Sequence, residues 1–188
     1  MNIKRYFSLF MLLGTCAIQA EILDVNITWN SYLCTQSCSE ILYRQFQKIR
    51  GVEQIRINEA AGTASLIWKP DAPFSYQMVK VPMQMAGVGV NDIRVSVRGR
   101  VREQGRQVAL ISEGDNTRFV LVSPIMPSKR MYTTKPNPYF RELAPNLRDR
   151  ILRDAEQDKI MVVEGPLYRP ARSPPLQIVV QSIRVERP

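Results

Sequence analysis

The sequence predicts an α+β protein in which a βαββαβ domain of residues 21–98 precedes a small five-stranded β-barrel of residues 99–188. Three observations support this fold class. Some short segments alternate apolar and polar residues as half-buried strands do, others carry apolar residues at helical spacing, and glycines and prolines separate the two kinds. With 188 residues, of which 45% are hydrophobic, the chain has the length and composition of one or two globular domains.

The first twenty residues are typical of an export signal and lie outside the predicted fold. Lys4 and Arg5 provide the positive end, residues 7–18 form an apolar run, and Ala20 offers a small residue for cleavage. The run is too short to cross a bilayer as a permanent helix. We therefore expect an exported, periplasmic or secreted protein with no transmembrane span after cleavage. Lipid attachment at Cys16 is the alternative.

The first domain is predicted to begin with a strand, a loop that contains cysteines, and a helix. Residues 23–29 alternate apolar and polar side chains and predict the strand. Gly51 is suited to end the helix, which is predicted from apolar residues at helical spacing: Ile41, Leu42, Phe46 and Ile49. Residues 52–58 and 63–69 then predict two strands that a short turn joins as a hairpin.

A second helix and a fourth strand complete this domain. Ser75 is a suitable cap for a helix that reaches Ala86, and Pro82 inside the helix predicts a kink or two short pieces. The next alternating segment could run as one strand over residues 93–103, bent at Gly99, and would then hold the two domains in one orientation. The order βαββαβ is the ferredoxin-like arrangement.

Residues 22–97 resemble the heavy-metal-associated domain, the small module of copper chaperones and metal-transporting ATPases. The resemblance rests on Cys38, on Gly51-Val52 thirteen positions later, and on the hairpin segments that follow. It implies a ferredoxin-like fold and a soft metal ion, Cu(I) or a similar one, bound by the thiolates of Cys34 and Cys38.

The cysteine pair departs from the pattern of that family. The family has Gly-Met-x-Cys-x-x-Cys, whereas this chain reads Tyr32-Leu33-Cys34-Thr35-Gln36-Ser37-Cys38, with CxxxC in place of CxxC. Thiolates are soft ligands suited to Cu(I), and the positive end of a helix dipole favours a thiolate at Cys38. Two alternatives stay open: a Cys34–Cys38 disulfide, which an oxidising compartment favours, and a reactive dithiol.

The second domain is predicted from strands on either side of a proline-containing loop and a helix. Residues 107–111 and 118–122 predict strands joined by a tight turn, and residues 147–155 predict an amphipathic helix. Residues 160–163 and 176–185 predict the last two strands. Three strands, a helix and two strands resemble an OB-fold, a five-stranded barrel, in architecture alone.

Positive charge is concentrated in the second domain. Residues 21–98 carry eight basic and seven acidic residues, whereas residues 99–188 carry sixteen and ten. We expect a partner, either a protein or an anionic envelope surface, to dock on a basic face of the barrel. Five arginines would form this face: Arg98, Arg100, Arg102, Arg106 and Arg118. Single-stranded nucleic acid is the alternative partner, although few aromatic residues fall on the central strands.

No catalytic constellation is visible in the sequence. The chain has no histidine, and it shows neither a glycine-rich phosphate loop nor a paired-carboxylate motif. We therefore expect a binding protein rather than an enzyme: an exported envelope protein that holds a soft metal through Cys34 and Cys38 and docks a partner through its barrel. The alternatives are a metal-free interaction module with a disulfide, and a nucleic-acid-binding barrel.

Overall fold

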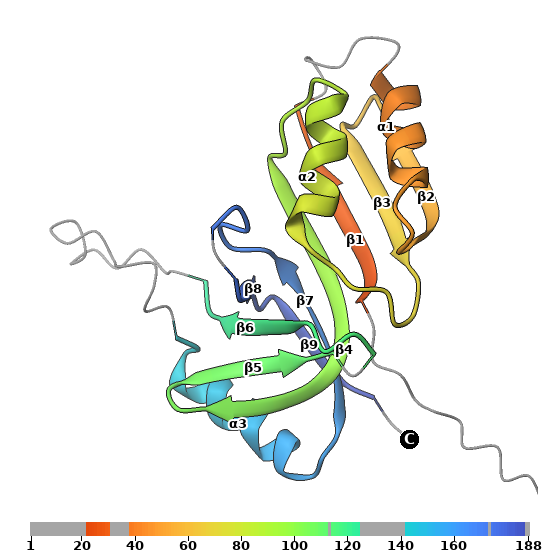
Figure 1. Cartoon of the computed structure of the whole chain (residues 1–188). Coiled ribbons are helices and arrows are strands. Elements are labelled where there is room, and N and C mark those ends of the chain that lie inside the picture. The colour runs from red at the N-terminus through yellow and green to blue at the C-terminus, as the bar shows by residue number, and fades with distance from the viewer. Residues whose placement is uncertain (1–21, 31–37, 113, 125–141, 173, 187–188) are drawn as a thin grey trace, which may run out of the picture.

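The structure, a computed structural model, describes residues 22–30, 38–112, 114–124, 142–172 and 174–186. Over these residues the chain has an α+β fold, in which nine strands form one mixed sheet and three helices pack beside it (Figure 1). The predicted export signal, Cys16 and Cys34 lie outside the described residues.

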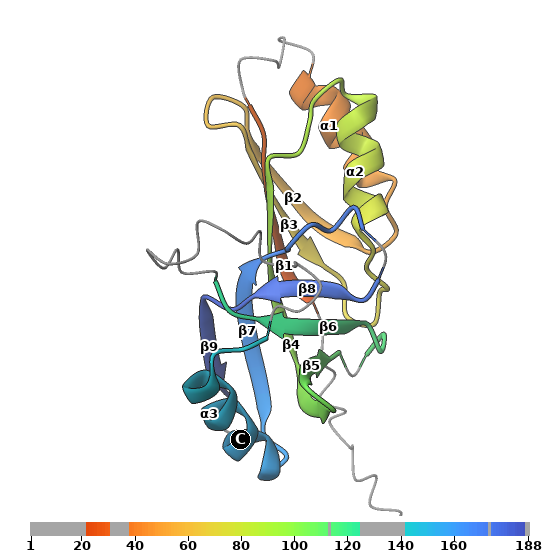
Figure 2. The ribbon, with the colours of Figure 1, turned by 90° about the vertical axis from the view of Figure 1, so that its left-hand side faces the viewer.

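The first half of the chain follows the predicted order of elements. These are β1 (Ile22–Thr28), α1 (Cys38–Gln47), β2 (Val52–Asn58), β3 (Thr63–Trp68), α2 (Tyr76–Met85) and β4 (Asp92–Gln104). The strands lie in the order β2-β3-β1-β4, and each pairs antiparallel with its neighbours. Both helices cover the same face of this part of the sheet (Figures 1 and 2).

Period-two alternation explains which face of β1 is buried. Val25 and Ile27 are fully buried beneath the helices, and Leu42 of α1 and Val79 of α2 pack into the same core. The opposite face of the sheet is polar, since the Ser65 hydroxyl donates a hydrogen bond of 3.0 Å to an Asp24 carboxylate oxygen there. The two helices therefore close one face of the sheet, and water reaches the other.

Helix α2 differs from its prediction at Pro82. A kink or two pieces were expected, but α2 is one helix of ten residues that contains Pro82. Pro82 is buried in the last turn, where the N–H of Ala86 donates to its carbonyl oxygen, so the helix ends soon after the interruption. Ser75 occupies the predicted N-cap position, although its side chain makes no capping hydrogen bond.

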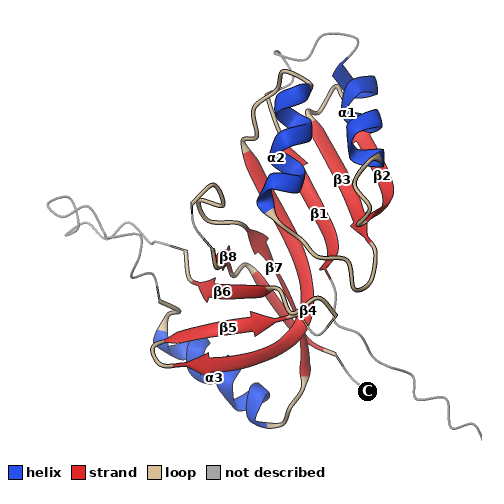
Figure 3. Cartoon of the chain, viewed as in Figure 1, coloured by secondary structure: helices blue, strands red, loops and turns tan. Residues whose placement is uncertain are grey.

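The long strand β4 joins the two halves of the sheet, which confirms the prediction of one continuous strand. It has 13 residues, pairs with β1 in its first part, and is prolonged beyond that pairing (Figure 3). A Cβ atom at Gly99 would lie 2.4 Å from the carbonyl oxygen of Ile111, at the end of the next strand. Glycine is therefore required where the chain passes closely over β4.

The second half contributes five strands and one helix. These are β5 (Gln107–Ile111), β6 (Arg118–Val122), α3 (Pro145–Glu156), β7 (Ile160–Pro166), β8 (Leu176–Val179) and β9 (Ser182–Val185). Strands β5 and β7 pair with β4, and β6 pairs antiparallel with β5 and parallel with β8. The single strand predicted over residues 176–185 is in fact two strands, β8 and β9, with different neighbours.

The predicted five-stranded barrel is not closed over the described residues. A strand has two hydrogen-bonding edges, and those of β7 are occupied by β4 and β9. Strand β8 therefore forms no ladder with β7, and one isolated bridge, Leu167 with Ile178, lies just beyond the end of β7. The sheet stays open, with β9 as an additional strand that the sequence did not predict.

Candidate functional site

The first candidate site is Cys38, the residue that begins α1. Its side chain is only 2% exposed, and it is disulfide-bonded. A disulfide sulfur has no thiolate charge to offer a metal ion. Among the described residues no three histidine, cysteine, aspartate or glutamate side chains gather as a metal site would need. Because Cys34 lies outside the described residues, the proposed metal pair stays a prediction.

Three of the five predicted arginines lie on one face of β4 but are already engaged. The Arg98 Nε donates to a carboxylate oxygen of Glu186 at 2.8 Å. Arg100 and Arg102 both bind Asp158, and the Arg102 nitrogen lies 3.1 Å from Asp158 Oδ1. Hydrogen bonds from Arg100 and then from Arg102 hold the pKa of the Asp158 carboxyl below its ordinary value.

These ion pairs give the β4 arginines a structural role. Asp158 lies between α3 and β7, and Glu186 follows β9, so both carboxylates come from segments distant in sequence. Of the other two predicted residues, Arg106 is in the exposed turn after β4, and Arg118 begins β6. Arg118 shares a sheet face with Arg100, because Arg100 pairs with Ile111 and Ile111 pairs with Arg118. A partner-binding face made of all five arginines stays a prediction.

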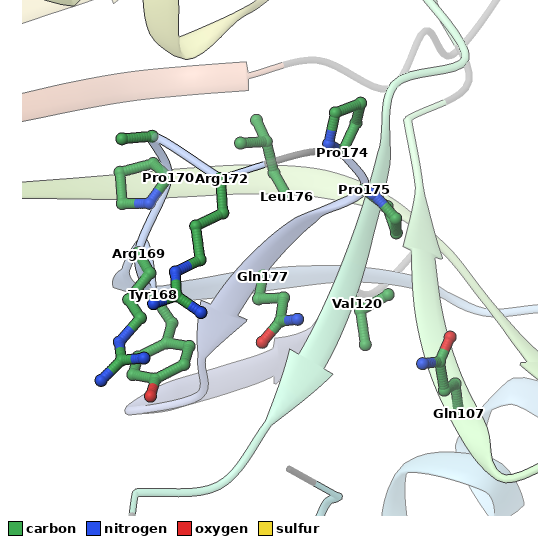
Figure 4. A pocket seen from close by; sticks show the side chains of 11 residues that line it. Gln107, Val120, Tyr168, Arg169, Pro170, Arg172, Pro174, Pro175, Leu176 and Gln177 are labelled. Carbon is green, nitrogen blue, oxygen red and sulfur yellow. The ribbon is translucent and has the colours of Figure 1, made fainter. Parts of the chain in front are cut away.

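Sequence reasoning missed a cavity of about 500 Å³ beneath the connection between β7 and β8. Figure 4 shows Tyr168, Arg169 and Arg172 on one side of it, Val120 and Gln107 on the other, and Gln177 between them. The cavity is thus built from residues of β5, β6 and β8 and from the loop that joins β7 to β8.

A second cavity, of about 440 Å³, adjoins the first and reaches the beginning of α2. It is lined by Phe74, Tyr76 and Arg118. The two cavities share the lining residues 170–172 and 174–176, three of which are prolines. We name the two together the proline-loop cleft. A hydrogen bond of 3.3 Å from the N–H of the lining residue Phe74 to Asp115 Oδ2 joins this wall to the turn between β5 and β6.

The lining of the proline-loop cleft is basic. It includes Arg118, Arg169 and Arg172 but no aspartate or glutamate. The Arg169 guanidinium lies 5.3 Å from the centre of the Tyr168 ring, a cation–π distance that orients the arginine. Within the described part of the chain, Arg118 and Arg169 form no ion pair with an acidic residue.

Two polar atoms in this lining have no hydrogen-bond partner among the described residues. They are Gln177 Oε1, an acceptor, and Arg118 Nε, a donor, and both are buried. Only a long contact, 3.5 Å, joins the terminal nitrogen of Arg118 to Gln107 Oε1. Buried polar groups are normally satisfied, so a bound molecule with its own donors and acceptors would complete this lining.

The signal that could have revealed the cleft is the segment Arg169-Pro170-Ala171-Arg172-Ser173-Pro174-Pro175. Two arginines stand here among three prolines, whose rings fix the backbone angle φ, and surface loops often carry binding residues. Its contact with Phe74 and Arg118 depends on the fold and could not be inferred from spacing.

No family model matches this chain, and neither does any curated protein or solved structure. The resemblance to heavy-metal-associated domains therefore rests on the residues alone. In the part of the chain that the structure describes, no helix is both long and apolar enough to span a membrane.

Proposed function

We propose that this protein is an exported, non-catalytic binding module of the cell envelope that docks an acidic segment of a partner protein in the proline-loop cleft. One observation carries this proposal: the cleft is lined by three arginines and rigid proline walls and by no acidic residue. Arginine binds carboxylates through two parallel hydrogen bonds, so it selects anionic groups by geometry as well as by charge.

The distribution of ion pairs supports the same surface. Two carboxylates, Asp158 and Glu186, partly neutralise three arginines of β4: Arg98, Arg100 and Arg102. Arg118 and Arg169 have no such neutralisation among the described residues, although residues 99–188 carry sixteen basic and ten acidic residues in total. The cleft therefore carries part of the positive charge of this half of the chain.

The size of the cleft fits a short extended segment. Ligand sites usually enclose about 300–1,000 Å³, and the two adjoining cavities measure about 500 and 440 Å³. Proline and leucine side chains give apolar contact, and Gln107 and Gln177 provide amide groups for a peptide backbone. An acidic peptide with a few apolar residues matches this lining.

We interpret the two halves as a ferredoxin-like unit and an OB-like unit that share β4. The proposed boundary between residues 98 and 99 falls inside this strand, which pairs with β1, β5 and β7. A shared strand keeps the start of α2 in contact with the loop after β7, and both segments line the cleft.

Soft-metal binding by reduced Cys34 and Cys38 is the second candidate function. The observation that favours it is the place of Cys38 at the first position of α1, where the helix dipole stabilises a thiolate. Because Cys38 is disulfide-bonded, this function would require prior reduction. In an oxidising envelope the disulfide persists, so we place the docking of an acidic segment before metal binding.

A titration with a labelled acidic peptide tests the first proposal. Fluorescence anisotropy of a hexaglutamate peptide is measured with the purified mature protein, and a hexalysine peptide serves as the control. We expect saturable, salt-dependent binding of hexaglutamate only, because charged contacts are screened by salt. Equal binding of both peptides, or of neither, would contradict an acidic partner.

A further inference from the structure

The strand β2 forms an open edge of the sheet. It lies at the end of the strand order and pairs only with β3 among the described residues (Figure 1). The backbone N–H and C=O groups on its outer side can therefore pair with an added strand. With seven residues, β2 is longer than β9, whose four residues form another edge.

A groove with apolar and polar walls accompanies this edge. Two cavities of about 430 and 690 Å³ lie between α1 and β2, and both are lined by Tyr43 and Ile55. Tyr43 is 45% exposed, one of few large hydrophobic side chains that the described surface leaves open. The open backbone edge and the exposed aromatic ring thus meet at Ile55.

We propose that a second copy of this chain docks here, with the two β2 strands paired antiparallel about a two-fold axis at Ile55. When a two-fold axis stands perpendicular to a sheet, each residue of one strand faces a residue of the other copy, the two residue numbers have a constant sum, and the two side chains lie on the same face. An axis at Ile55 places Ile55 opposite Ile55 of the other copy. It also places Gln54 of each copy opposite Arg56 of the other.

This register is self-complementary. Gln54 and Arg56 are exposed on the face away from the helices, and an amide oxygen opposite a guanidinium accepts a hydrogen bond. An axis at Arg56 would instead oppose two guanidinium groups, and an axis at Gln54 would set Arg56 against Val52. Glu53 stands at a β-bulge, outside the regular register.

The same axis explains the exposed tyrosine. Because Tyr43 and Ile55 line the same cavities, Tyr43 of each copy would lie beside the paired strands and lose contact with water. In an isologous interface the same surface patch of both copies must be complementary to itself. Here the central pair of isoleucines at position 55 is flanked on each side by a pair of Gln54 with Arg56. The inference is independent of the proline-loop cleft.

Sedimentation equilibrium of the mature protein tests this proposal, with circular dichroism to confirm that each variant is folded. We expect a reversible dimer. Gln54→Arg should raise its dissociation constant about tenfold, since two like-charge pairs with Arg56 are created, whereas Gln54→Glu should lower it. Tyr43→Lys should also weaken the dimer, while Val81→Lys, at an equally exposed position on α2 (46%), should leave it unchanged.

Two results would overturn the proposal. One is a wild-type protein that stays monomeric at the highest concentration reached, in which case the edge is left to a strand of another protein. The other is a dimer whose dissociation constant does not move in opposite directions for Gln54→Arg and Gln54→Glu. Electrophoresis without reductant identifies any dimer that is linked by a disulfide, and such a covalent dimer is not counted as evidence for pairing of the β2 strands.

Discussion

Gly165 of β7 lies directly against the carbonyl oxygen of Val179 of β8: a Cβ atom at position 165 would be 1.9 Å from that oxygen. The two strands therefore touch although no ladder of hydrogen bonds joins them. This contact holds the connection between β7 and β8, which is the loop that forms the shared wall of the cleft.

Replacing Gly165 by alanine is expected to destabilise the protein. The added methyl group must displace the backbone of β8, and overpacking of this kind costs about 1–3 kcal/mol. Thermal denaturation followed by circular dichroism measures the loss. Gly89→Ala is the matched control, because a Cβ atom there would meet nothing within 4 Å. Equal melting temperatures for the two variants would show that the strands can separate freely.

Local patterns predicted most elements of the first half, because each depends on neighbours in sequence. The alternation that buries Val25 and Ile27 and the helical spacing of Leu42 and Phe46 are local properties. Barrel closure was predicted wrongly because it depends on long-range pairing. Nothing near Ser182 in the sequence indicates that it pairs with Glu164.

The ion pairs of Asp158 should give the stability a defined pH dependence. Its pKa is lowered in the folded protein, so the folded state binds fewer protons than the unfolded state around the ordinary value of 3.8. The contribution of the ionised Asp158 to the free energy of unfolding is complete above pH 3.8 and is lost as the pH falls through the pKa of the folded state. Asp158→Asn should therefore be less stable than wild type at pH 7 and equally stable in strong acid.

Urea unfolding at the two pH values measures this difference. Asparagine tolerates the positive φ of 50° at position 158, so the variant changes the charge without straining the backbone. Asp149→Asn, the same change of charge on the exposed face of α3, is the control. A stability difference for Asp158→Asn that persists unchanged in acid would refute the electrostatic explanation.

The state of Cys38 predicts a thiol count. The proposed cleavage after Ala20 would leave only Cys34 and Cys38 in the mature chain, and Cys38 is disulfide-bonded. Protein that is exported from cells and unfolded without reductant should therefore show no free thiol. After reduction the same protein should show two free thiols. Cu(I) should bind only the reduced form, which a titration with a chromogenic competitor detects. Two free thiols before reduction would favour the metal-binding candidate instead.

The candidate site was less predictable than the fold. Arginines at alternate positions of β4 were a sound signal of a shared face, but Asp158 and Glu186 reach that face only through the tertiary structure. The cleft likewise assembles Phe74, Arg118 and Arg172 from three distant segments. Charge composition indicated an anionic partner and could not indicate which arginines remain available to it.

The most direct test of the account compares two double variants of equal net charge in the hexaglutamate titration. Arg118→Gln with Arg169→Gln alters the cleft, whereas Arg150→Gln with Arg153→Gln alters exposed positions of α3. Charged hydrogen bonds contribute about 1.5–3 kcal/mol each, so the first pair should weaken binding at least about tenfold. The second pair should change it little. Equal losses for the two pairs would contradict docking in the proline-loop cleft.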